Sequence, residues 1–586
     1  MEEHMEGGAM YIAGIDVGGT NTDAALIKDD LVVATGKVPT DQDNLVDSTA
    51  AALESILGSW RDAEPLELHL STTLSTNIVV EGRGDPVFVA AVPGPGMRIE
   101  DLDLGFPVYR LSGSVDHRGR ETAGLIPEEV KAALASARQA GMEALAAVGK
   151  FSHRNPSQEL EIEALAQEGS FGFRHITLGH RLSGRPNFPR RLATSYLNAS
   201  VAGQQAGFVE MVKRLMLRGR SIGRVYLLKA DGGTMTLEDS LIRPIETILS
   251  GPAASLMGAQ ALTEHRHGNA VIVDIGGTTT DIAVQVSGEP VFEPQGAEIA
   301  GHKTLVPALF ARSIGLGGDS EIRVIEGARG GTRAPRLLIG PKRAGTPAAL
   351  GGSRATPTDA AAALGLTSIG DAARAQRAVA ELARALGLGI EEAAQEVING
   401  FTRQLMEAIE EAYAYLESRP VYTISELLAP PDIRPRVLIG LGGPAEVFIP
   451  LAAQAMGIGW EVLPYHEEAN AIGAAASRPT AAVTYHADTA LGAATVPEMD
   501  YIGEIHRPMF FDLNKARQEA QRWAAEQGKR LGVMDLKDIS IIEEESFNMV
   551  RGFHTVGRIL TIRAQVRPNV RRIAAGAKGG KADAGR

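Results

Sequence analysis

The chain has 586 residues, 44% of them hydrophobic, which is enough for more than one core, and we expect two or three domains. Its formal net charge is −13 and its Lys and Arg residues are scattered except at the C-terminus, so a nucleic-acid binder is disfavoured against a protein that binds small ligands or protein partners. The absence of cysteine excludes disulfides, thiolate metal sites and a Cys nucleophile.

The first predicted element is a β-hairpin that begins near Met10. An apolar strand runs to Val17, a Gly-Gly turn follows, and a second apolar strand ends near Lys28. The pattern recurs from Asn269, where D-I-G-G-T-T-T-D repeats the earlier D-V-G-G-T-N-T-D. This repeat predicts a duplicated architecture in which two loops hold one triphosphate from opposite sides.

Helices and strands alternate between and after the two hairpins, which favours an α/β fold. An Ala-rich amphipathic helix is predicted within 127–146, strands within 175–180 and 224–233, and an almost wholly helical stretch over 358–417. From Val437 the pattern is strand, Gly turn and helix.

The chain changes character from about Arg478, where a helix over 514–531 and a strand over 557–566 predict a small C-terminal α+β unit. No run of about 18 apolar residues could cross a membrane and no signal peptide is evident, so we place the protein in the cytoplasm. The predicted divisions are a disordered extension over 1–9, a first lobe with an inserted α/β region over 10–200, a second lobe over 201–478, the C-terminal unit over 479–573 and a disordered tail over 574–586.

Each D-(V/I)-G-G-T turn could bind phosphate, because backbone N–H groups and Thr hydroxyls surround a concavity that glycines leave open. A single Gly-Gly after a strand could equally be a plain hairpin turn, whereas two copies with the same flanking residues favour nucleotide binding. The residues predicted to contact the nucleotide here are Gly18, Gly19, Thr20, Asn21, Gly276, Gly277, Thr278 and Thr279.

The aspartates of these motifs are candidates for metal binding and catalysis. Asp16 and Asp274 lie at strand ends, where their oxygens could hold Mg²⁺ or Mn²⁺ directly or through water, or could orient an attacking water. The sequence does not separate these roles. The trailing Asp23 and Asp281 are as readily explained as carboxylates that stabilise their own hairpins.

A third Gly element, Gly442-Gly443, ends a strand and would let an adenine ring lie against bare backbone, with Pro444 at the first position of the next helix. Two phosphate loops followed by a nucleoside loop resemble the actin, sugar-kinase and Hsp70 ATPase superfamily. The segment E-E-A-N-A-I-G-A-A over 467–475 resembles the small-residue helix that crosses between the two halves of that fold.

Further segments resemble the hydantoinase/oxoprolinase family, which includes the ATP-binding subunits of N-methylhydantoinase, 5-oxoprolinase and acetone or acetophenone carboxylases. The similarity runs in family order from about residue 10 to 478. The segments are S-T-T-L-S-T-N (71–77), F-S-H-R-N-P (151–156), R-R-L-A-T-S-Y-L-N-A (190–199), A-D-G-G-T-M (230–235), L-S-G-P-A-A-S (249–255), G-L-G-G-D-S (315–320) and P-T-D-A (357–360).

The resemblance implies duplicated actin-like (ribonuclease H-like) ATPase domains that flank a cleft for ATP and Mg²⁺. It also implies an enzyme that phosphorylates the oxygen of a cyclic amide, imide or ketone for later hydrolysis or carboxylation. A hydantoinase B/oxoprolinase-like second subunit would complete a hetero-oligomer. The alternatives are a nucleotide-dependent switch or chaperone-like module, and a small-molecule kinase that releases its product.

The hydroxyl and amide side chains of the segments that resemble the family are candidates for binding substrate. Four of them could bind a phosphate or a cyclic imide, although a capped helix start explains them too: Thr72, Thr73, Thr76 and Asn77. Arg191 and Asn198 lie on one face of a predicted helix, where Arg191 could hold a phosphate or carboxylate, or could be solvated. Asp231 follows a strand and is a third catalytic candidate.

Three positions depart from the family pattern. Asp319 replaces a Gly in G-L-G-G-D-S beside Gly317 and Gly318, two further predicted nucleotide-binding residues, and could bind metal or repel phosphate. Residues 344–348 lack a usual acidic residue, and Phe448 stands where His is usual. We expect these changes near the site. The histidines are dispersed, which gives no zinc pattern.

Overall fold

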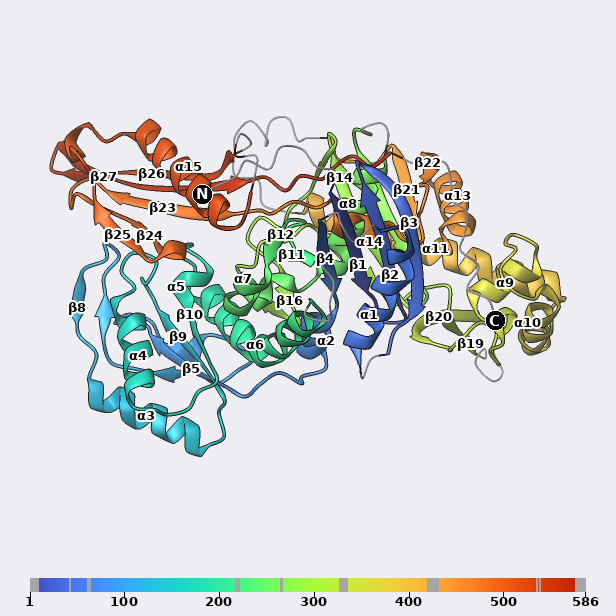
Figure 1. Cartoon of the computed structure of the whole chain (residues 1–586), viewed down its shortest axis with the longest axis horizontal. Helices are drawn as coiled ribbons and strands as arrows, with labels where there is room; N and C mark the ends of the chain where they lie inside the picture. The colour runs from blue at the N-terminus through green and yellow to red at the C-terminus, as the bar shows by residue number, and fades with distance from the viewer. Residues whose placement is uncertain are drawn as a thin grey trace, which may run out of the picture.

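A computed structural model describes residues 10–41, 44–60, 65–216, 222–263, 267–325, 336–418, 432–533, 536 and 539–574 (Figure 1). The fold is a mixed α/β fold, with two six-stranded sheets at its centre, a four-stranded sheet and a five-stranded sheet. The extension predicted over 1–9 and most of the tail predicted over 574–586 lie outside the described residues. Ala574 itself forms a β-bridge with Leu31.

The first six-stranded sheet has the order β12-β11-β4-β1-β2-β3. Its strands are β1 (Tyr11–Val17), β2 (Asn21–Lys28), β3 (Leu31–Pro39), β4 (Leu66–Thr72), β11 (Ile222–Leu228) and β12 (Thr234–Thr236). The predicted hairpin is confirmed: β1 pairs with β2 antiparallel, and with β4 parallel. The apolar residues of β1 and β4 pack against α1 (Leu45–Ile56) and α6 (Phe188–Met216).

The second six-stranded sheet repeats this pairing, which confirms the second predicted hairpin. β13 pairs antiparallel with β14 and parallel with β21. The sheet contains β13 (Ala270–Ile275), β14 (Thr280–Val286), β15 (Glu289–Pro290), β18 (Ala311–Ile314), β21 (Val437–Leu441) and β22 (Gly459–Val462). One face packs on α11 (Ile390–Glu417) and α13 (Ala445–Met456).

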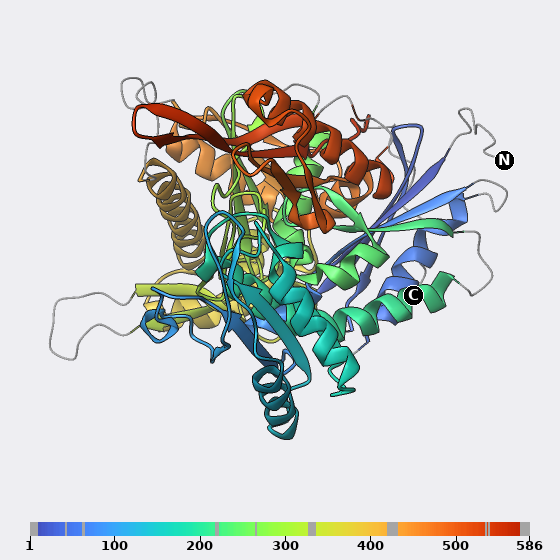
Figure 2. The ribbon, with the colours of Figure 1, turned by 90° about the vertical axis from the view of Figure 1, so that its left-hand side faces the viewer.

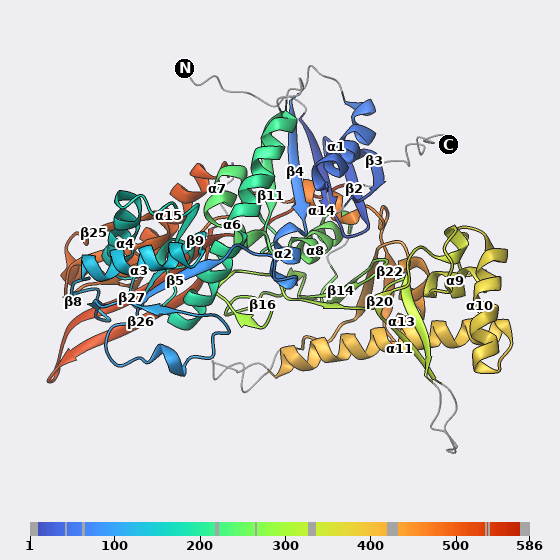
Figure 3. The ribbon, with the colours of Figure 1, turned by 90° about the horizontal axis from the view of Figure 1, so that it is seen from below.

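Two helices rich in small residues, α8 (Ser250–Leu262) and α14 (Ala469–Ala476), lie between the two sheets (Figures 1 and 3). They cross so closely that a Cβ added to Gly258 would lie 2.2 Å from the backbone oxygen of Ala469. A Cβ on Gly473 would lie 2.1 Å from the oxygen of Ala254. Only glycine fits at these two positions, which fixes how the two halves are joined.

The inserted region and the C-terminal unit form separate sheets that lie at the same end of the molecule (Figures 1 and 2). The inserted sheet has the order β10-β9-β5-β6 and the C-terminal sheet β25-β24-β23-β27-β26. Their strands are β5 (Val87–Val92), β6 (Tyr109–Arg110), β9 (Ala144–Gly149), β10 (His175–Leu178), β23 (Ala482–Asp488), β24 (Ala493–Val496), β25 (Tyr501–Glu504), β26 (Ile539–Arg551) and β27 (His554–Val566).

The remaining helices are α2 (Leu74–Val80), α3 (Pro127–Gln139), α4 (Ser157–Glu168), α5 (Gly179–Leu182), α7 (Leu237–Ile242), α9 (Pro357–Ala363), α10 (Ala372–Leu386) and α15 (Leu513–Arg530). The remaining strands are β7 (Ser114–Val115), β8 (Glu121–Ala123), β16 (Glu298–Ile299), β17 (His302–Lys303), β19 (Ser320–Ile325) and β20 (Arg336–Arg343). Within the described ranges, no helix has the length and apolar character needed to span a bilayer.

The helices predicted over 127–146, 358–417 and 514–531 are present, the second as three helices. The lobe boundary predicted at residue 200 falls inside α6, and β11 and β12 pair within the first sheet. The first sheet therefore includes strands from beyond that boundary. One of them is β11, the parallel neighbour of β4, which follows the inserted region in the chain.

Candidate nucleotide and substrate site

The two D-(V/I)-G-G-T turns have the same backbone geometry. The amide of Gly18 donates to the carbonyl oxygen of Asn21 over 3.1 Å, and the amide of Gly276 donates to that of Thr279 over 2.9 Å. Gly19, one residue further along the first turn, is exposed. The two hairpins are therefore structural copies, and their exposed turn backbone is what a phosphate could approach.

The leading and trailing aspartates of each motif face each other across the hairpin. Asp16 is the cross-strand partner of Asp23, and Asp274 is the partner of Asp281. Each hairpin thus carries two carboxylates side by side at the end that leads into its glycine turn. Sequence spacing alone did not reveal this pairing, because it depends on the register of the strands.

The four carboxylates influence one another electrostatically. Burial, reinforced by the charge of Asp274, raises the pKa of Asp16 to about 6 against hydrogen bonds from Ser71 and Asn470. Burial raises the pKa of Asp281 to about 7, and the charges of Asp274 and Asp16 act in the same direction. The aspartates of the two hairpins therefore face one common region, in which concentrated negative charge disfavours ionisation.

Asp23 has a more local environment. Burial raises its pKa to about 7 against the attraction of Lys37, whose Nζ lies 3.3 Å from Oδ1 of Asp23. Lys37 is also the cross-strand partner of Asp23 on β3. This ion pair agrees with the interpretation of Asp23 as a residue that stabilises its own hairpin.

Asp274 is held by side chains of two helices, Ser255 and Asn470, neither of which the sequence analysis named as a site residue. Oγ of Ser255 on α8 donates to Oδ2 of Asp274 over 2.7 Å, and Nδ2 of Asn470 on α14 donates to the same oxygen over 3.0 Å. Asn470 is the polar residue in the run A-N-A-I-G-A-A-A, and that contrast was the available sequence signal. Together these contacts connect the second phosphate loop to both inter-sheet helices.

Asp16 has a free oxygen suited to a cation. Its side chain is buried at 6% exposure, yet its Oδ1 has no hydrogen-bond partner among the described residues. A buried carboxylate oxygen in this state fits a hard cation such as Mg²⁺, or a water bound to one. Across the described ranges no group of three or more acidic or His side chains could hold a metal, so the phosphates and water would have to supply most ligands.

Gly317 and Gly318 pack closely against the backbone of the second phosphate loop. The amide of Gly318 donates to the oxygen of Gly276 over 2.9 Å, and a Cβ on Gly317 would lie 2.5 Å from the backbone of Gly277. Since these contacts use the amide of Gly318, the predicted role of this pair in contacting nucleotide remains a prediction. The structure shows close support of the loop.

Asp319 lies directly over that loop. Its Oδ2 would be 2.7 Å from a Cβ placed on Gly277, and it accepts a hydrogen bond from Nη2 of Arg343 over 2.8 Å. Burial raises the pKa of Asp319, while Arg343 opposes this. The departure from the family pattern therefore places a paired carboxylate beside a phosphate loop.

The other two departures are explained by packing. Asp359 accepts hydrogen bonds from the amides of Ala348 and Ala349 over 3.0 and 2.7 Å, so it anchors the turn that ends the divergent segment. Phe448 is 1% exposed and stacks on Phe401 of α11 with ring centroids 3.8 Å apart. The amide of Phe448 donates to the oxygen of Pro444, so the residue follows the nucleoside loop closely, but its ring is part of the core.

The nucleoside loop touches the second hairpin directly. Gly442 has φ of 84°, and a Cβ there would lie 2.2 Å from the oxygen of Ile275 and 2.8 Å from Oδ1 of Asp274. Gly443 has no atom within 4 Å of an added Cβ, so its backbone is open. Pro444 is the N-cap of α13 rather than its first helical residue.

The predicted substrate cluster lies at the start of α2, next to the first phosphate loop. Oγ1 of Thr73 donates to the oxygen of Val17 over 3.4 Å. Oγ of Ser250 donates to the oxygen of Thr72 over 2.9 Å, and the amide of Leu249 donates to Oγ1 of Thr76 over 3.2 Å. Nδ2 of Asn77 donates to Thr73. The cluster thus connects the first hairpin with the start of α8.

Asp231 lies in a different polar environment. Its Oδ2 is 3.1 Å from Nζ of Lys229 and accepts from Oγ1 of Thr480 over 3.2 Å, while its Oδ1 accepts from the amide of Gly233 over 3.0 Å. None of these partners contacts the aspartates of the two hairpins. Both oxygens are used in contacts that join the first sheet to the chain around Thr480.

Arg191 and Asn198 are also buried among protein groups. The guanidinium of Arg191, at 0% exposure, donates to the carbonyl oxygens of Gly149, Lys150 and Arg185, and burial lowers its pKa to about 10. Nδ2 of Asn198 donates to Thr177 and to Ile242, and Oδ1 of Asn198 accepts from the amide of Ile245. The idea of a solvated Arg191 is wrong, because the guanidinium is fully enclosed.

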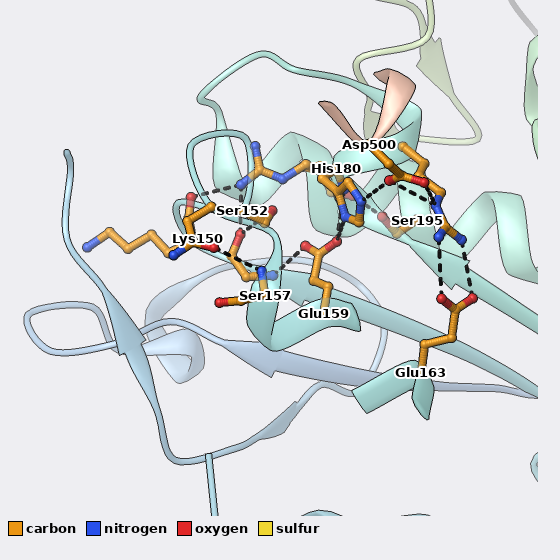
Figure 4. A network of polar contacts seen from close by, with 12 residues as sticks. Lys150, Ser152, Ser157, Glu159, Glu163, His180, Ser195 and Asp500 are labelled. Carbon is orange, nitrogen blue, oxygen red and sulfur yellow. Dashed lines mark hydrogen bonds and ion pairs between the residues drawn. The ribbon is translucent and has the colours of Figure 1, made fainter. Parts of the chain in front are cut away.

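A polar network around His180 joins the inserted region to the C-terminal unit (Figure 4). Nδ1 of His180 lies 2.6 Å from Oε2 of Glu159, and its Nε2 lies 2.7 Å from Oδ1 of Asp500. Burial lowers the pKa of His180, but the two carboxylates outweigh it and raise that pKa to about 9. No sequence pattern predicts this contact, because His180 and Asp500 are 320 residues apart in the chain.

Comparison with known proteins agrees with this architecture. A family model described as the hydantoinase/oxoprolinase N-terminal region matches residues 12–170, and one described as hydantoinase/oxoprolinase matches residues 191–483. Caprolactamase subunit alpha of Pseudomonas jessenii is 24% identical over 490 residues, which cover 76% of this chain and 67% of the relative. 5-oxoprolinase 1 of Arabidopsis thaliana is 30% identical over 305 residues, 44% of this chain but 23% of the relative.

Two solved structures share the fold. The ATP-dependent caprolactamase of Pseudomonas jessenii superposes with a TM-score of 0.69 at 20% identity, covering 98% of this chain and 90% of that one. Acetone carboxylase in its nucleotide-free form superposes with a TM-score of 0.67 at 19% identity, covering 96% and 88%. The predicted α/β fold class is thereby confirmed.

Proposed function

This chain belongs to the hydantoinase/oxoprolinase family, and we propose that it uses ATP to phosphorylate the oxygen of a cyclic amide or imide, or of a ketone. The observation that carries the proposal is the pair of matching hairpins, in which the charge of Asp274 on the second acts on the pKa of Asp16 on the first. Two such loops facing one region suit a triphosphate better than a single loop would. The names of the relatives support ATP as the co-substrate and a cyclic amide or ketone as the acceptor.

The nucleotide would lie between the two hairpins with its adenine toward Gly443. Exposed backbone of the two glycine turns would donate hydrogen bonds to phosphate oxygens. Asp16 and Asp274 would hold Mg²⁺ directly or through water, and the ion would offset charge on the phosphates. Asn470 and Ser255 would orient Asp274 by donating hydrogen bonds to it.

In the chemical step a bond forms from the γ-phosphorus to the carbonyl oxygen of the substrate as the bond to the β–γ bridging oxygen breaks, and ADP leaves. When the acceptor is an amide, its N–H proton must be taken up by a base whose pKa lies near neutral pH. Asp281, whose pKa is raised to about 7, is well matched to accept it. Water then adds to the ring carbon, and the ring C–N bond breaks as its nitrogen takes up a proton, which leaves an acyl phosphate. A second water attacks the acyl carbon, and phosphate departs with the original carbonyl oxygen.

The hydroxyls at the start of α2 are our candidates for the substrate side of the cleft. Thr73 bonds to the carbonyl of Val17, which immediately precedes the first glycine turn. Asn77 extends the same cluster by one helical turn. We propose that these two partly exposed side chains orient the acceptor carbonyl.

A second subunit of the hydantoinase B/oxoprolinase type is proposed as the partner that completes turnover. The caprolactamase relative is named as a subunit, which supports a multi-subunit assembly. The matched part of this chain covers only 23% of the 5-oxoprolinase relative, so that much longer protein has room for additional parts.

The proposal is tested by following one oxygen atom. The protein, with and without its partner, is incubated with ATP and a substrate labelled with ¹⁸O at the carbonyl, chosen from caprolactam, hydantoin and 5-oxoproline. Released phosphate is then examined by mass spectrometry. Transfer of ¹⁸O into phosphate is the expected result, and it should be lost in Asp16→Asn but kept in Asp103→Asn, which changes an exposed aspartate.

The two alternatives give different outcomes. A kinase that releases its product would leave the label in a stable organic phosphate. A nucleotide-dependent switch would hydrolyse ATP with unlabelled phosphate only, and its rate would respond to a protein client rather than to the small molecules. Either outcome overturns the proposal.

A further inference from the structure

A large cavity lies at the edge of the first sheet opposite the phosphate loops. Its volume is about 770 Å³, which is within the range of small-molecule sites. The starts of β1, β4 and β11 border it, whereas Asp16 and Ser71 lie at the other ends of β1 and β4. Its apolar walls come from the first sheet, α14 and the C-terminal unit: Ile12, Leu66, Tyr226, Ala475, Val533 and Val566.

A buried histidine, one ring nitrogen of which makes no hydrogen bond to the described residues, lines this cavity. His69 is 4% exposed, and its Nδ1 lies 3.0 Å from the oxygen of Ala474, which leaves Nε2 for another partner. Nε2 makes no hydrogen bond within the described part of the chain and is 3.7 Å from Oε2 of Glu67. The ring of Tyr226 packs edge-on against His69 at 5.1 Å. Because Nδ1 donates to a carbonyl oxygen, Nε2 of the neutral ring is an acceptor, and a water that donates to it would be stabilised in the cavity.

Four guanidinium groups surround the same space in a chain whose net charge is −13. They belong to Arg224 and Arg478, and to Arg567 and Arg571 of the C-terminal segment. Their side chains make no hydrogen bond, and no ion pair within 4 Å, with the described residues, unlike the side chains of Arg191 and Arg343. Burial raises the pKa of Glu67, but His69 and then the charges of Arg224 and Arg571 outweigh burial and hold that pKa below its usual value.

The acidic groups at the cavity only partly offset these cations. Asp29 and Asp30 lie in the exposed β2–β3 turn at its rim, and Glu67 is the remaining carboxylate of the lining. No acidic side chain of the described residues lies within 4 Å of the guanidinium groups of Arg478 and Arg567. Guanidinium groups bind carboxylates through paired hydrogen bonds, and the apolar walls suit a hydrocarbon body.

We propose that this cavity is a binding site for an organic carboxylate with an apolar body, separate from the nucleotide cleft. The carboxylate would accept hydrogen bonds from the guanidinium groups of the arginines at the rim. Its body would lie against Tyr226, Leu66 and Val566. The site stands on its own geometry and does not depend on the reaction proposed above.

Isothermal titration calorimetry of the full chain with octanoate tests this site. Octanoate should bind at one site, whereas octan-1-ol, which lacks the charge, and acetate, which lacks the apolar body, should each bind at least about tenfold more weakly. Gly223→Phe is a steric block, because Gly223 borders the cavity and an added Cβ there meets only the oxygen of Leu66 at 3.7 Å. Its matched control is Gly268→Phe at another exposed glycine.

The charge requirement is tested independently of the block. The double variant Arg224→Gln with Arg571→Gln should weaken octanoate at least about tenfold, and Arg377→Gln with Arg403→Gln, on exposed faces of α10 and α11, should not. Circular dichroism confirms that each variant is folded. The proposal is overturned if octanoate gives no binding, if octan-1-ol binds equally well, or if the cavity variants bind octanoate as the parent does.

Discussion

Asn470 donates a hydrogen bond to Asp274 over 3.0 Å, and this single contact joins α14 to the second phosphate loop. The side chain of Asn470 also lowers the pKa of Asp16 against the effect of burial. One amide thus serves the leading aspartates of both hairpins. Its position on a helix between the two sheets explains how one side chain reaches both.

Replacing this amide by a carboxylate should therefore disrupt the site. Asn470→Asp removes the donor to Asp274 and adds a negative charge beside Asp274 and Asp16, so we expect the affinity for an ATP analogue to fall about tenfold or more. Calorimetric titration in the presence of Mg²⁺ measures it. Asn399→Asp, an exposed change on α11, is the control and should bind normally. Unchanged affinity in Asn470→Asp would remove Asn470 from the site.

The two glycines of the nucleoside loop provide a matched pair. Gly442→Ala places a Cβ against Ile275 and Asp274 at a residue with φ of 84°, whereas Gly443→Ala meets nothing within 4 Å. We expect Gly442→Ala to destabilise the protein by about 1–3 kcal/mol and to weaken ATP binding. Gly443→Ala should keep its stability. Chemical denaturation and nucleotide titration report both effects, and equal behaviour of the two variants would contradict the geometry.

The carboxylate at position 319 should oppose phosphate binding rather than assist it. Asp319→Asn keeps the size of the side chain but removes its charge beside Gly277 and frees Arg343 from its ion pair. We expect the affinity for ATP to rise, by up to about tenfold. Titrations at several Mg²⁺ concentrations decide the matter. A loss of affinity that appears only with Mg²⁺ would instead identify Asp319 as a metal ligand.

Buried aspartates should make stability depend on pH. The pKa of Asp281 is raised from 3.8 to about 7, so the folded state binds more protons than the unfolded state between these values. Stability from this group is present at low pH and is lost as pH rises toward 7. Asp281→Asn removes that loss, and its apparent melting temperature should exceed that of the parent at pH 8 by about 2–4 °C.

The difference produced by Asp281→Asn should shrink toward pH 4, where the folded parent is protonated too. Asp103→Asn, an exposed aspartate, should show neither effect. Thermal scans at a series of pH values without nucleotide measure both variants. A difference that grows as pH falls would have the wrong sign and would contradict the raised pKa.

Arg191 should act as a structural residue. Its guanidinium donates to three backbone carbonyls, so Arg191→Met leaves those acceptors unpaired and should cost about 3–5 kcal/mol of stability. ATP affinity of the folded fraction should stay the same. If Arg191 bound substrate, the variant would instead raise KM at unchanged stability.

The sequence by itself identified the repeated hairpins, the third glycine turn, the α/β class and the family resemblance. These are local features: strand periodicity and glycine punctuation are written in adjacent residues and survive without knowledge of neighbours. The helical stretch over 358–417 and the strand at Val437 were predictable for the same reason.

Only the tertiary structure decided which polar residues meet. Asn470 reaches Asp274 from 196 residues away, Phe448 turns into the core against Phe401, and Arg191 is enclosed by backbone carbonyls. Residue type told us that each could bind something, but partners depend on strand register and on how closely glycine lets two helices cross. Asp16 and Asp274 were named from the sequence, whereas their shared region between two sheets follows from packing that no local pattern records.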